Sequence, residues 1–279
     1  MAAPEAPRIG IFDSGIGGLS VLRALHRQLP QADITYLADA RYTPWGDRSA
    51  AWVVARSLQL GGYLVDGGAD LVLVACNTAS TLAIGALRAR WPGGLFVGVE
   101  PGIKPAAAAS PSGRIAVLGT SATLASDRFG QLVEAHAVGT LLLRLPCPGL
   151  ADAIERAGTS PAADQQLDAR LDALAHTLKD AGVDTVVLAC THYPLVSTAL
   201  AQRLGSGVAL LDTADAVVRQ VLKLLGRSSI CGSPDGSPPR RRDMTRLLST
   251  GPPEGLQRAA RRWIDPHARS AWLDLPDLA

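Results

Sequence analysis

The chain has 279 residues, and the 47% of them that are hydrophobic can fill one large core or two modest ones. Its 27 basic and 25 acidic residues leave a formal net charge of +2, so no overall field attracts nucleic acid or anionic lipid. No apolar run approaches the roughly 20 residues of a membrane-spanning helix, and the amino-terminal stretch holds no signal-peptide core. These features predict a cytoplasmic protein with neither a nucleic-acid partner nor a membrane partner.

The first part of the chain alternates between strand and helix patterns. Residues 8–12 are typical of a strand, Asp13 to Gly18 of a glycine-rich turn, and residues 19–29 of an amphipathic helix that ends before Pro30. Further strands are predicted at 34–37, 71–75 and 95–99, with helices at 49–65 and 78–90. Strands that alternate with helices predict right-handed crossovers and a mainly parallel sheet.

The same pattern starts again at residue 114. The apolar run Arg114 to Leu118, with the small polar residues after it, matches the run Arg8 to Phe12 that lies 106 positions earlier. A second landmark, Ala-Cys at the end of an apolar run, recurs at Cys76 and Cys190, 114 positions apart. We interpret these offsets as an internal repeat with a short insertion, and a chance match of short apolar runs is the alternative.

The repeat predicts an α/β protein of two pseudo-symmetric domains, each with a mainly parallel sheet flanked by helices, and an active site in the cleft between them. The Pro- and Ala-rich stretch at 101–111 marks the crossing from one to the other. We therefore expect residues 1–100 and 210–279 to form the first domain and residues 101–209 the second. The returning tail would pack on the first domain, because its apolar surface is too small for a third core.

The tail itself contains several short predicted elements. They are a strand near 208–212, a helix at 214–225, an edge strand at 244–250 and a closing helix at 254–263. The segment at 227–242 is rich in Gly, Ser and Pro and ends in three arginines. This composition is typical of a mobile loop, and we do not expect a nucleic-acid site there.

Four cysteines are scattered along the chain without a Cys-x-x-Cys pair, so neither a disulfide scaffold nor a metal site is expected. Two of them, Cys76 and Cys190, follow buried-strand patterns, and parallel sheets bind ligands at the carboxyl ends of their strands. The N–H groups of the next helix would favour a thiolate there. A free cysteine is also a common small buried residue, but the duplication favours two equivalent groups acting on two sides of one substrate.

Polar residues accompany both thiols. Asp13 and Ser14 follow the first strand, where the carboxylate could orient or deprotonate Cys76, or could cap the next helix. His192 lies two residues after Cys190 and could exchange a proton with it, although a lone histidine is more often structural.

Three other features have two interpretations each. Glu155, at the start of a predicted helix, is either an acidic partner of the second thiol or its histidine, or a solvated residue. The turn Pro44-Trp45-Gly46 either offers backbone groups to a small polar ligand or is a plain loop. The glycines from Gly15 to Gly18 suggest a nucleotide site, but their spacing does not match the dinucleotide fingerprint and no Gly-Lys-Ser/Thr occurs.

Five motifs follow one another along nearly the whole chain. They are Phe12-Asp-Ser-Gly-Ile-Gly-Gly-Leu-Ser20, Pro44-Trp-Gly46, Ala75-Cys-Asn-Thr-Ala79, Val117-Leu-Gly-Thr120 and Ala189-Cys-Thr-His-Tyr-Pro-Leu195. Together they closely resemble the bacterial glutamate racemases, whereas aspartate and hydantoin racemases fit less well. The resemblance implies interconversion of L- and D-glutamate without a cofactor, to supply D-glutamate for peptidoglycan and hence cell shape. It also implies glutamate as the small-molecule partner, and a homodimer, which is common in the family.

The resemblance assigns roles to individual residues. Cys76 and Cys190 fall on the two catalytic positions, Asp13 and His192 on the residues that assist them, and Glu155 on a third assisting acid. The implied substrate contacts are Asp13, Ser14, Trp45, Gly46, Asn77, Thr78, Thr120, Thr123, Thr191 and His192. No metal is implied. The family commonly has Tyr in place of Trp45 and a bulky residue in place of Gly149.

The chemistry supports the resemblance independently. Inverting a carbon stereocentre by proton exchange needs a base on one face and an acid on the other, and two related halves supply one thiol for each face. A thiol has an ordinary pKa of about 8.5, which a neighbouring histidine or a helix N-terminus can lower. The alternative hypotheses are a racemase acting on aspartate or a hydantoin, and a non-catalytic binder of an acidic amino acid or a protein partner.

Overall fold

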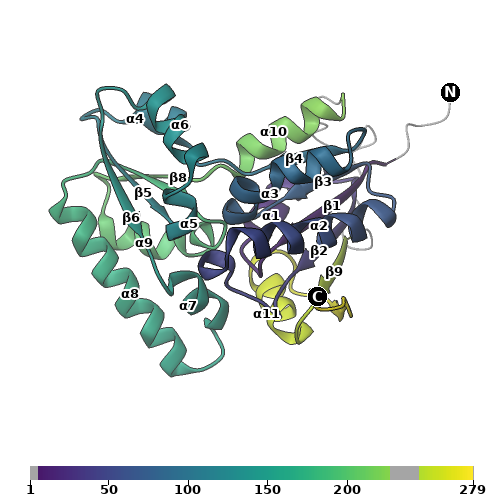
Figure 1. Cartoon of the computed structure of the whole chain (residues 1–279). Coiled ribbons are helices and arrows are strands. Elements are labelled where there is room, and N and C mark those ends of the chain that lie inside the picture. Colours follow the sequence, from purple (N-terminus) through teal and green to yellow (C-terminus); the bar gives the residue numbers. More distant parts are fainter. Residues whose placement is uncertain (1–5, 227–244, 279) are drawn as a thin grey trace, which may run out of the picture. The chain divides into compact units, whose positions relative to one another are not determined.

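The computed structural model describes residues 6–226 and 245–278. The chain forms two compact units: the first comprises the chain up to Val99 and again from Ala214, and the second is Glu100–Thr213. Each unit has its own parallel sheet with helices packed against it (Figure 1). The predicted α/β fold class, with two sheets in two domains, is confirmed.

The first unit contains a six-stranded sheet in the order β10-β9-β2-β1-β3-β4, in which every pair of strands is parallel. Its strands are β1 (Arg8–Asp13), β2 (Asp33–Ala38), β3 (Leu71–Val74), β4 (Leu95–Gly98), β9 (Thr245–Ser249) and β10 (Ser270–Trp272). Its helices are α1 (Leu19–Gln28), the 3-10 turn η1 (Trp45–Asp47), α2 (Ala50–Asp66), α3 (Asn77–Arg90), α10 (Ala214–Leu224) and α11 (Pro253–Trp263). Helix α2 packs on α3, and α1 packs on α10 and α11. The two groups cover opposite faces of the sheet, because right-handed crossovers on either side of β1 lead to opposite faces.

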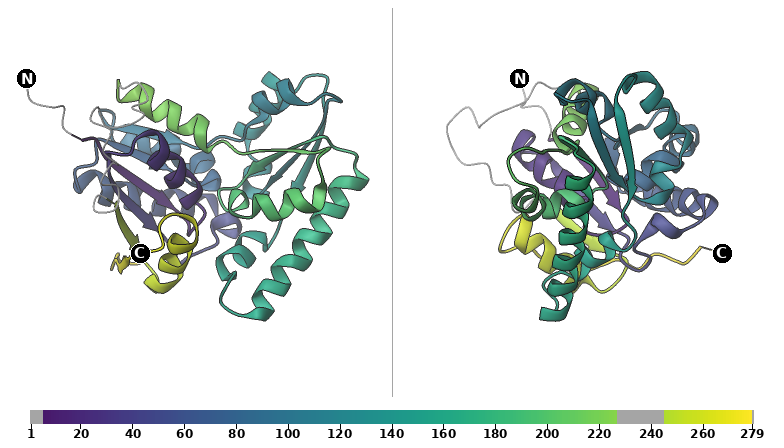
Figure 2. Two further views of the ribbon diagram at one scale, coloured as in Figure 1. Left: turned by 180° about the vertical axis from the view of Figure 1, so that it is seen from behind. Right: turned by 90° about the vertical axis from the view of Figure 1, so that its left-hand side faces the viewer.

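The second unit contains a four-stranded parallel sheet in the order β6-β5-β7-β8. Its strands are β5 (Arg114–Gly119), β6 (Leu141–Pro146), β7 (Thr185–Ala189) and β8 (Ala209–Leu211). Its helices are α4 (Ile103–Ala109), α5 (Ser121–Leu124), α6 (Asp127–His136), α7 (Leu150–Arg156), α8 (Pro161–Asp180), the 3-10 turn η2 (Tyr193–Val196) and α9 (Ser197–Leu204). Helices α4 and α6 pack together, and α8 packs on α7 and α9, with the sheet between the two groups (Figure 2).

The internal repeat is present in both strand order and register. The order β2-β1-β3-β4 in the first sheet corresponds to β6-β5-β7-β8 in the second. Ile9 pairs with Leu71 in the first sheet, and Ile115 pairs with Thr185 in the second. These partners are separated by the same offsets of 106 and 114 that the sequence contains. Cys76 and Cys190 therefore follow equivalent strands at equivalent positions.

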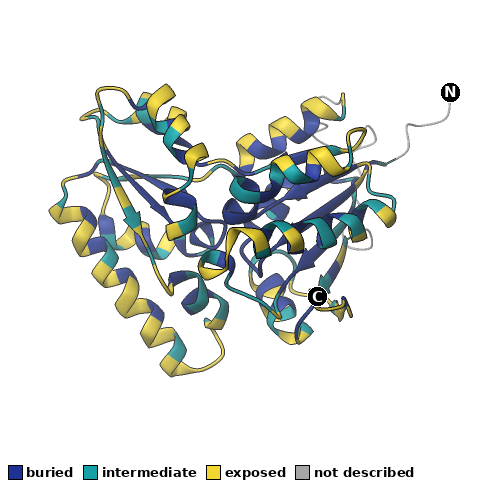
Figure 3. Ribbon diagram, viewed as in Figure 1, coloured by how far each residue is buried: buried dark blue, intermediate teal, exposed yellow. Residues whose placement is uncertain are grey.

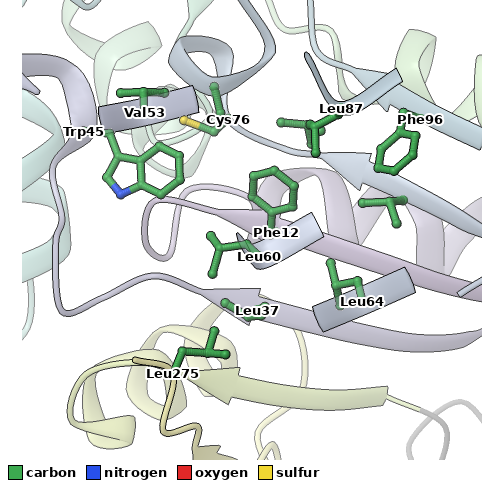
Figure 4. Close-up of a cluster of buried hydrophobic side chains, with 13 residues drawn as sticks. Phe12, Leu37, Trp45, Val53, Leu60, Leu64, Cys76, Leu87, Phe96 and Leu275 are labelled. Atoms are coloured by element: carbon green, nitrogen blue, oxygen red, sulfur yellow. The ribbon is translucent and has the colours of Figure 1, made fainter. Parts of the chain in front are cut away.

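Burial explains why these segments form their elements. The central strands β1, β3, β5 and β7 are buried on both faces, while the helices alternate between buried and exposed sides (Figure 3). Helix α8 shows the pattern clearly, because Leu167, Leu171, Ala175 and Leu178 recur every three or four residues on its buried side. In the first unit, buried side chains from β1, β3, α2 and α3 form one hydrophobic cluster, which includes Cys76 and Trp45 (Figure 4).

Two expectations about the tail are wrong. The strand predicted at 244–250 is not an edge strand: β9 lies between β2 and β10, because the three-residue strand Ser270–Trp272, too short to give a recognisable pattern, adds outside it. Strand β8 does not return to the first unit but pairs with β7, so the chain crosses back after Thr213. The whole of the predicted mobile loop, 227–242, and the start of the predicted edge strand lie outside the described residues.

Candidate active site

The carboxyl end of β1 forms a tight turn around the carboxylate of Asp13. Oδ1 accepts hydrogen bonds from the Ser14 backbone N–H (2.7 Å) and from the Ser14 hydroxyl (3.3 Å), and Oδ2 accepts one from the Gly18 N–H. The Tyr36 hydroxyl holds the same turn by donating to the Gly15 carbonyl at 2.7 Å. Asp13 therefore organises the turn that leads into α1, and it also positions the Ser14 side chain.

Cys76 is the N-cap residue of α3 and has extended backbone geometry directly after β3. It is 5% exposed, and its Sγ–H donates to the Ser14 hydroxyl over 3.8 Å. Because Ser14 also donates to Asp13, the three side chains form one chain of polar contacts. The fold thus brings Asp13 and Ser14, which the sequence predicted near this thiol, together with Cys76.

Asn77 and Thr78 open helix α3, and both are buried. The Asn77 side-chain nitrogen has no hydrogen-bond partner among the atoms of the described residues. A buried donor without a partner costs about 1–3 kcal/mol, so a ligand oxygen that accepted this hydrogen bond would relieve the cost. Asn77 is therefore placed next to Cys76 as a donor available to a ligand.

Trp45 lies at the start of η1, but its indole ring is a core group. The ring is buried in the same hydrophobic cluster as Cys76, and its Nε1–H donates to Asp39 Oδ2 at 3.2 Å (Figure 4). Gly46 is half-buried beside it. A ligand contact from this turn would therefore come from the backbone of Trp45 and Gly46, which is how the sequence interpretation of the turn assigned it.

Asp39 and Arg56 form a buried ion pair that sequence reasoning missed. Both side chains are fully buried, and the Arg56 Nη2 lies 2.6 Å from Asp39 Oδ1. The Thr250 hydroxyl donates to the same carboxylate at 2.8 Å, and Arg56 also donates to the Pro276 carbonyl at 3.0 Å. An arginine within a helical pattern normally indicates a solvated face, so no local signal predicts this pair.

Cys190 follows β7 and lies in a line of three polar side chains. It is 7% exposed, and its Sγ is 3.8 Å from His192 Nδ1, while His192 Nε2 is 2.7 Å from Glu155 Oε1. Glu155 belongs to the last turn of the short helix α7, not to the start of a helix as the sequence indicated. The fold thus brings Glu155 to the histidine from 37 residues away.

The electrostatics of this line favour a charged histidine. Burial by itself lowers the pKa of His192, because it disfavours the ionised ring. Hydrogen bonds with Cys190 and Glu155, together with the negative charges of these groups, outweigh burial and raise the pKa well above its ordinary value. His192 therefore carries an imidazolium at neutral pH, with one ring N–H available to the Cys190 sulfur and the other to Glu155.

Three threonines line the carboxyl edge of the second sheet. Thr120 follows β5 and caps α5: its hydroxyl accepts from the Thr123 N–H at 3.2 Å and is 2.9 Å from the Thr123 hydroxyl. Thr191 follows β7, which is the neighbour of β5, and is buried. Thr120 is half-exposed, whereas Thr123 is fully buried. Thr120 and Thr191 therefore share one edge, and Thr123 supports Thr120.

Two further residues next to Cys190 were not assigned to the site from the sequence. The hydroxyl of Tyr193 is buried without a hydrogen-bond partner among the described residues, and burial first, then the Cys190 and Cys147 thiols, raise its pKa well above the ordinary value. Tyr193 could have been suspected from its place beside Cys190, Thr191 and His192. The closeness of Cys147 depends on the strand order β6-β5-β7, which no local pattern reveals.

Within residues 6–226 and 245–278, no group of three His, Cys, Asp or Glu side chains is placed to hold a metal ion. No helix in this described part of the chain is long and apolar enough to cross a membrane.

The sequence model of the Asp/Glu/Hydantoin racemases matches residues 9–221, and the chain belongs to this family. Its relatives include the glutamate racemase of Pseudomonas paraeruginosa, which is 40% identical over 240 residues, covering 86% of this chain and 89% of that protein. A glutamate racemase of Bacillus anthracis has a TM-score of 0.81 at 26% identity, covering 97% and 98% of the two chains. The Escherichia coli glutamate racemase, solved with L-glutamate and the activator UDP-MurNAc-Ala, has a TM-score of 0.77 at 30% identity, covering 93% and 96%.

Proposed function

We propose that this protein interconverts L- and D-glutamate without a cofactor, by moving the Cα proton between two thiols. The observation that carries the proposal is the pair Cys76 and Cys190, which follow register-equivalent strands and each have a polar partner. The similarity to glutamate racemases supports glutamate as the substrate. A protein that only bound an amino acid would need neither thiol.

The proposed reaction is a proton exchange across one carbon. One cysteine, as a thiolate, removes the Cα proton from one face of glutamate and leaves a carbanion. The other cysteine, as a thiol, donates its proton to the opposite face, so one C–H bond is broken, another is formed, and the second sulfur becomes the thiolate. No electrons are gained or lost. Both thiols must face one substrate, and we propose a cleft between the two units as the binding site.

The neighbouring side chains have defined tasks in this proposal. Asp13 holds the Ser14 hydroxyl against Cys76, and Glu155 holds the His192 imidazolium against Cys190. An imidazolium beside a sulfur stabilises the thiolate and can return a proton to it. The two assisting groups thus let each cysteine alternate between its acid and base forms.

The carbanion needs donors around the substrate carboxylate, because negative charge spreads onto it during the reaction. Asn77, whose amide nitrogen is buried without a partner among the described atoms, is the clearest candidate. We propose the remaining substrate contacts as the sequence assigned them. They are Asp13, Ser14, Thr78, Thr120, Thr123, Thr191 and His192 with the backbone of Trp45 and Gly46.

In the cell, we propose that the enzyme supplies D-glutamate for peptidoglycan from the cytoplasm, as a homodimer. Peptidoglycan precursors carry D-amino acids, so a D-glutamate supply fits a role in the cell wall and in cell shape. Analytical ultracentrifugation would test the assembly, since a monomer at working concentrations would rule out the homodimer.

The test of the proposed activity is isotope exchange in heavy water with purified protein. Unlabelled L- or D-glutamate should each gain deuterium at Cα and convert to the other enantiomer. Cys76→Ser and Cys190→Ser should both abolish conversion, and each should retain exchange for a different enantiomer, because the remaining thiol serves one face. The two variants are therefore controls for one another.

Absence of exchange with both enantiomers of glutamate would overturn the proposal. Aspartate and a hydantoin are assayed in parallel. If the protein racemises one of these substrates but not glutamate, it is a racemase of that substrate instead.

A further inference from the structure

The turn that carries Ser14 is held in place by a second loop of the first unit. The Thr43 hydroxyl donates a hydrogen bond to the Ser14 carbonyl from 29 positions away along the chain. On the other side of the same residue, the Ser14 N–H donates to the Asp13 carboxylate at 2.7 Å. Ser14 is 5% exposed, so its backbone groups depend on partners within the protein. The Ser14 backbone is therefore fixed at its N–H by Asp13 and at its carbonyl by Thr43.

The position of the Ser14 backbone determines where its side chain points. The Ser14 hydroxyl donates to Asp13 Oδ1 at 3.3 Å and accepts the Cys76 Sγ–H over 3.8 Å. The first of these contacts is already longer than the usual O–H···O range of about 2.5–3.0 Å, so a small displacement of the backbone would break it. Thr43 thus acts on the first thiol through Ser14, by keeping this hydroxyl between the carboxylate and the sulfur.

The loop that presents Thr43 is anchored on either side of it. The Tyr42 N–H donates to the Asp39 carbonyl at 3.0 Å, and the Tyr42 hydroxyl donates to the Asp277 carboxylate. Two residues after Thr43, the indole ring of Trp45 is buried in the hydrophobic cluster that also contains the first thiol (Figure 4). An exposed polar contact contributes little, whereas a buried aromatic ring fixes the chain to which it belongs. The Thr43 hydroxyl is therefore held in place before it meets Ser14.

We propose that Thr43 is a positioning residue for the first thiol, whose hydroxyl fixes the Ser14 backbone and through it the Ser14 hydroxyl against Cys76. The same hydrogen bond joins the two segments of the first unit that are proposed to face the substrate, the turn at Asp13 and Ser14 and the backbone of Trp45 and Gly46. The catalytic consequence rests on the proposed racemase function, while the hydrogen bond itself does not.

Two substitutions separate the hydroxyl from the rest of the side chain. Thr43→Val keeps the branched shape and removes the donor, and Thr43→Ser keeps the donor and removes the methyl group. Thr43 is half-buried at the edge of the loop, so neither change opens a cavity in the core. A role of the hydroxyl predicts an effect of valine that serine does not share.

Carbonyl NMR measures the hydrogen bond without requiring activity. Isotope labels on the serine carbonyl carbon and the glycine nitrogen select the Ser–Gly peptide bonds, of which the sequence has three, at Ser14, Ser112 and Ser206. Ser112→Ala and Ser206→Ala assign the signals, because each removes one. A carbonyl carbon that accepts a hydrogen bond is deshielded, so the Ser14 signal should move upfield in Thr43→Val. It should stay in place in Thr43→Ser, and the other two signals should not move in either variant.

Proton exchange in heavy water tests whether the effect is confined to the first thiol. In a Cys190→Ser background, exchange at Cα of glutamate depends on Cys76, and Thr43→Val should slow it about tenfold, which corresponds to about 1.4 kcal/mol. In a Cys76→Ser background, exchange depends on Cys190, and the same substitution should change it less than about twofold. Thr43→Ser should restore the exchange that depends on Cys76.

Thr177→Val is the matched control. The Thr177 hydroxyl also donates to a carbonyl, that of Ala173 at 3.1 Å, but on the exposed side of α8 in the second unit. Its loss should leave the Ser14 signal and both exchange rates unchanged.

The outcomes that would overturn the proposal are distinct. An unmoved Ser14 signal in Thr43→Val would rule out the hydrogen bond, and a moved signal with unchanged exchange by Cys76 would rule out the positioning role. Equal losses of exchange in the two backgrounds, or a failure of Thr43→Ser to restore exchange, would mean that general damage to the loop is the cause. If the Ser14 signal moves but the parent protein shows no exchange, the proposed function fails while the Thr43 hydrogen bond stands.

Discussion

At the scale of residues, the two related thiols have unlike neighbours. Cys76 donates to a neutral hydroxyl that Asp13 holds in place, whereas Cys190 adjoins an imidazolium that Glu155 holds in place. The repeat therefore duplicates the position of the sulfur but not its electrostatics. The second thiol lies beside a positive charge that both Cys190 itself and Glu155 favour.

We expect Glu155→Gln to lower the pKa of His192, because the carboxylate raises it through both its charge and a 2.7 Å hydrogen bond. With less imidazolium beside Cys190, kcat/KM should fall by about 10²-fold, equally for both enantiomers. NMR titration of labelled histidine measures the pKa directly. The exposed Glu134 of α6 gives the matched control, since Glu134→Gln should leave the His192 titration unchanged. A His192 pKa that did not fall in Glu155→Gln would contradict this coupling.

The same pair links stability to pH. A histidine whose pKa rises on folding binds its proton more tightly in the native state, so its contribution is complete below the unfolded pKa of about 6.5. The contribution is lost as pH rises through the raised native pKa. The destabilisation caused by Glu155→Gln should therefore be larger at pH 6 than in alkaline solution, as urea unfolding would measure.

At the scale of elements, the first site depends on the packing of one turn. The turn from Asp13 to Gly18 brings the carboxylate, the Ser14 hydroxyl and the start of α1 together. A Cβ atom on Gly18 would lie 2.9 Å from the Tyr36 hydroxyl and 3.0 Å from the Asp13 Cβ. Gly18 has ordinary helical backbone angles, so the absence of a side chain is needed for space and not for conformation.

We expect Gly18→Ala to destabilise the first unit by about 1–3 kcal/mol, because the added methyl group would overpack the turn. The same methyl group should displace Asp13 and so lower kcat/KM. Gly85→Ala is the matched control: this glycine is exposed within α3, and nothing lies within 4 Å of its added methyl group. Alanine there should stabilise by about 0.5–1 kcal/mol through helix propensity. Urea unfolding followed by fluorescence measures both, and equal effects of the two variants would refute the steric argument.

At the scale of the whole chain, a buried ion pair joins segments that are far apart in sequence. Asp39 after β2 is bound by Arg56 of α2, Trp45 of the loop and Thr250 after β9, and Arg56 also reaches the carbonyl of Pro276. These contacts attach the returning carboxyl-terminal segment to the first unit. They also hold the turn whose backbone is proposed to face the substrate.

Breaking this pair should be costly, because it leaves a buried carboxylate without its counter-charge. We expect Arg56→Met to destabilise the first unit by about 3–5 kcal/mol. Arg27→Met removes an exposed ion pair with Asp215 in the same unit and should cost less than about 1 kcal/mol. Tryptophan fluorescence during urea unfolding reports on this unit alone, because all five tryptophans belong to it. Similar losses of stability in the two variants would show that the buried ion pair stabilises the first unit no more than the exposed one.

Much of the first-unit architecture was predictable because its strands and helices are regular. The spacing of apolar residues and the placement of Gly and Pro marked β1 to β4 and α1 to α3 to within two residues. Strands β6 and β10 were missed, since β6 is only half-buried at a sheet edge and β10 has three residues. The partner of β8 was also assigned wrongly, because a short strand carries no information about which sheet it joins.

The sequence alone was sufficient for the two thiols, the repeat that relates them and the racemase family, because each depends on short, contiguous patterns at strand ends. It left open whether Glu155 contacts His192 or solvent, and it could not place Arg56 against Asp39. These contacts depend on strand order and on helix packing across segments that are distant along the chain. The fold therefore decides which of several available polar residues lie beside each thiol.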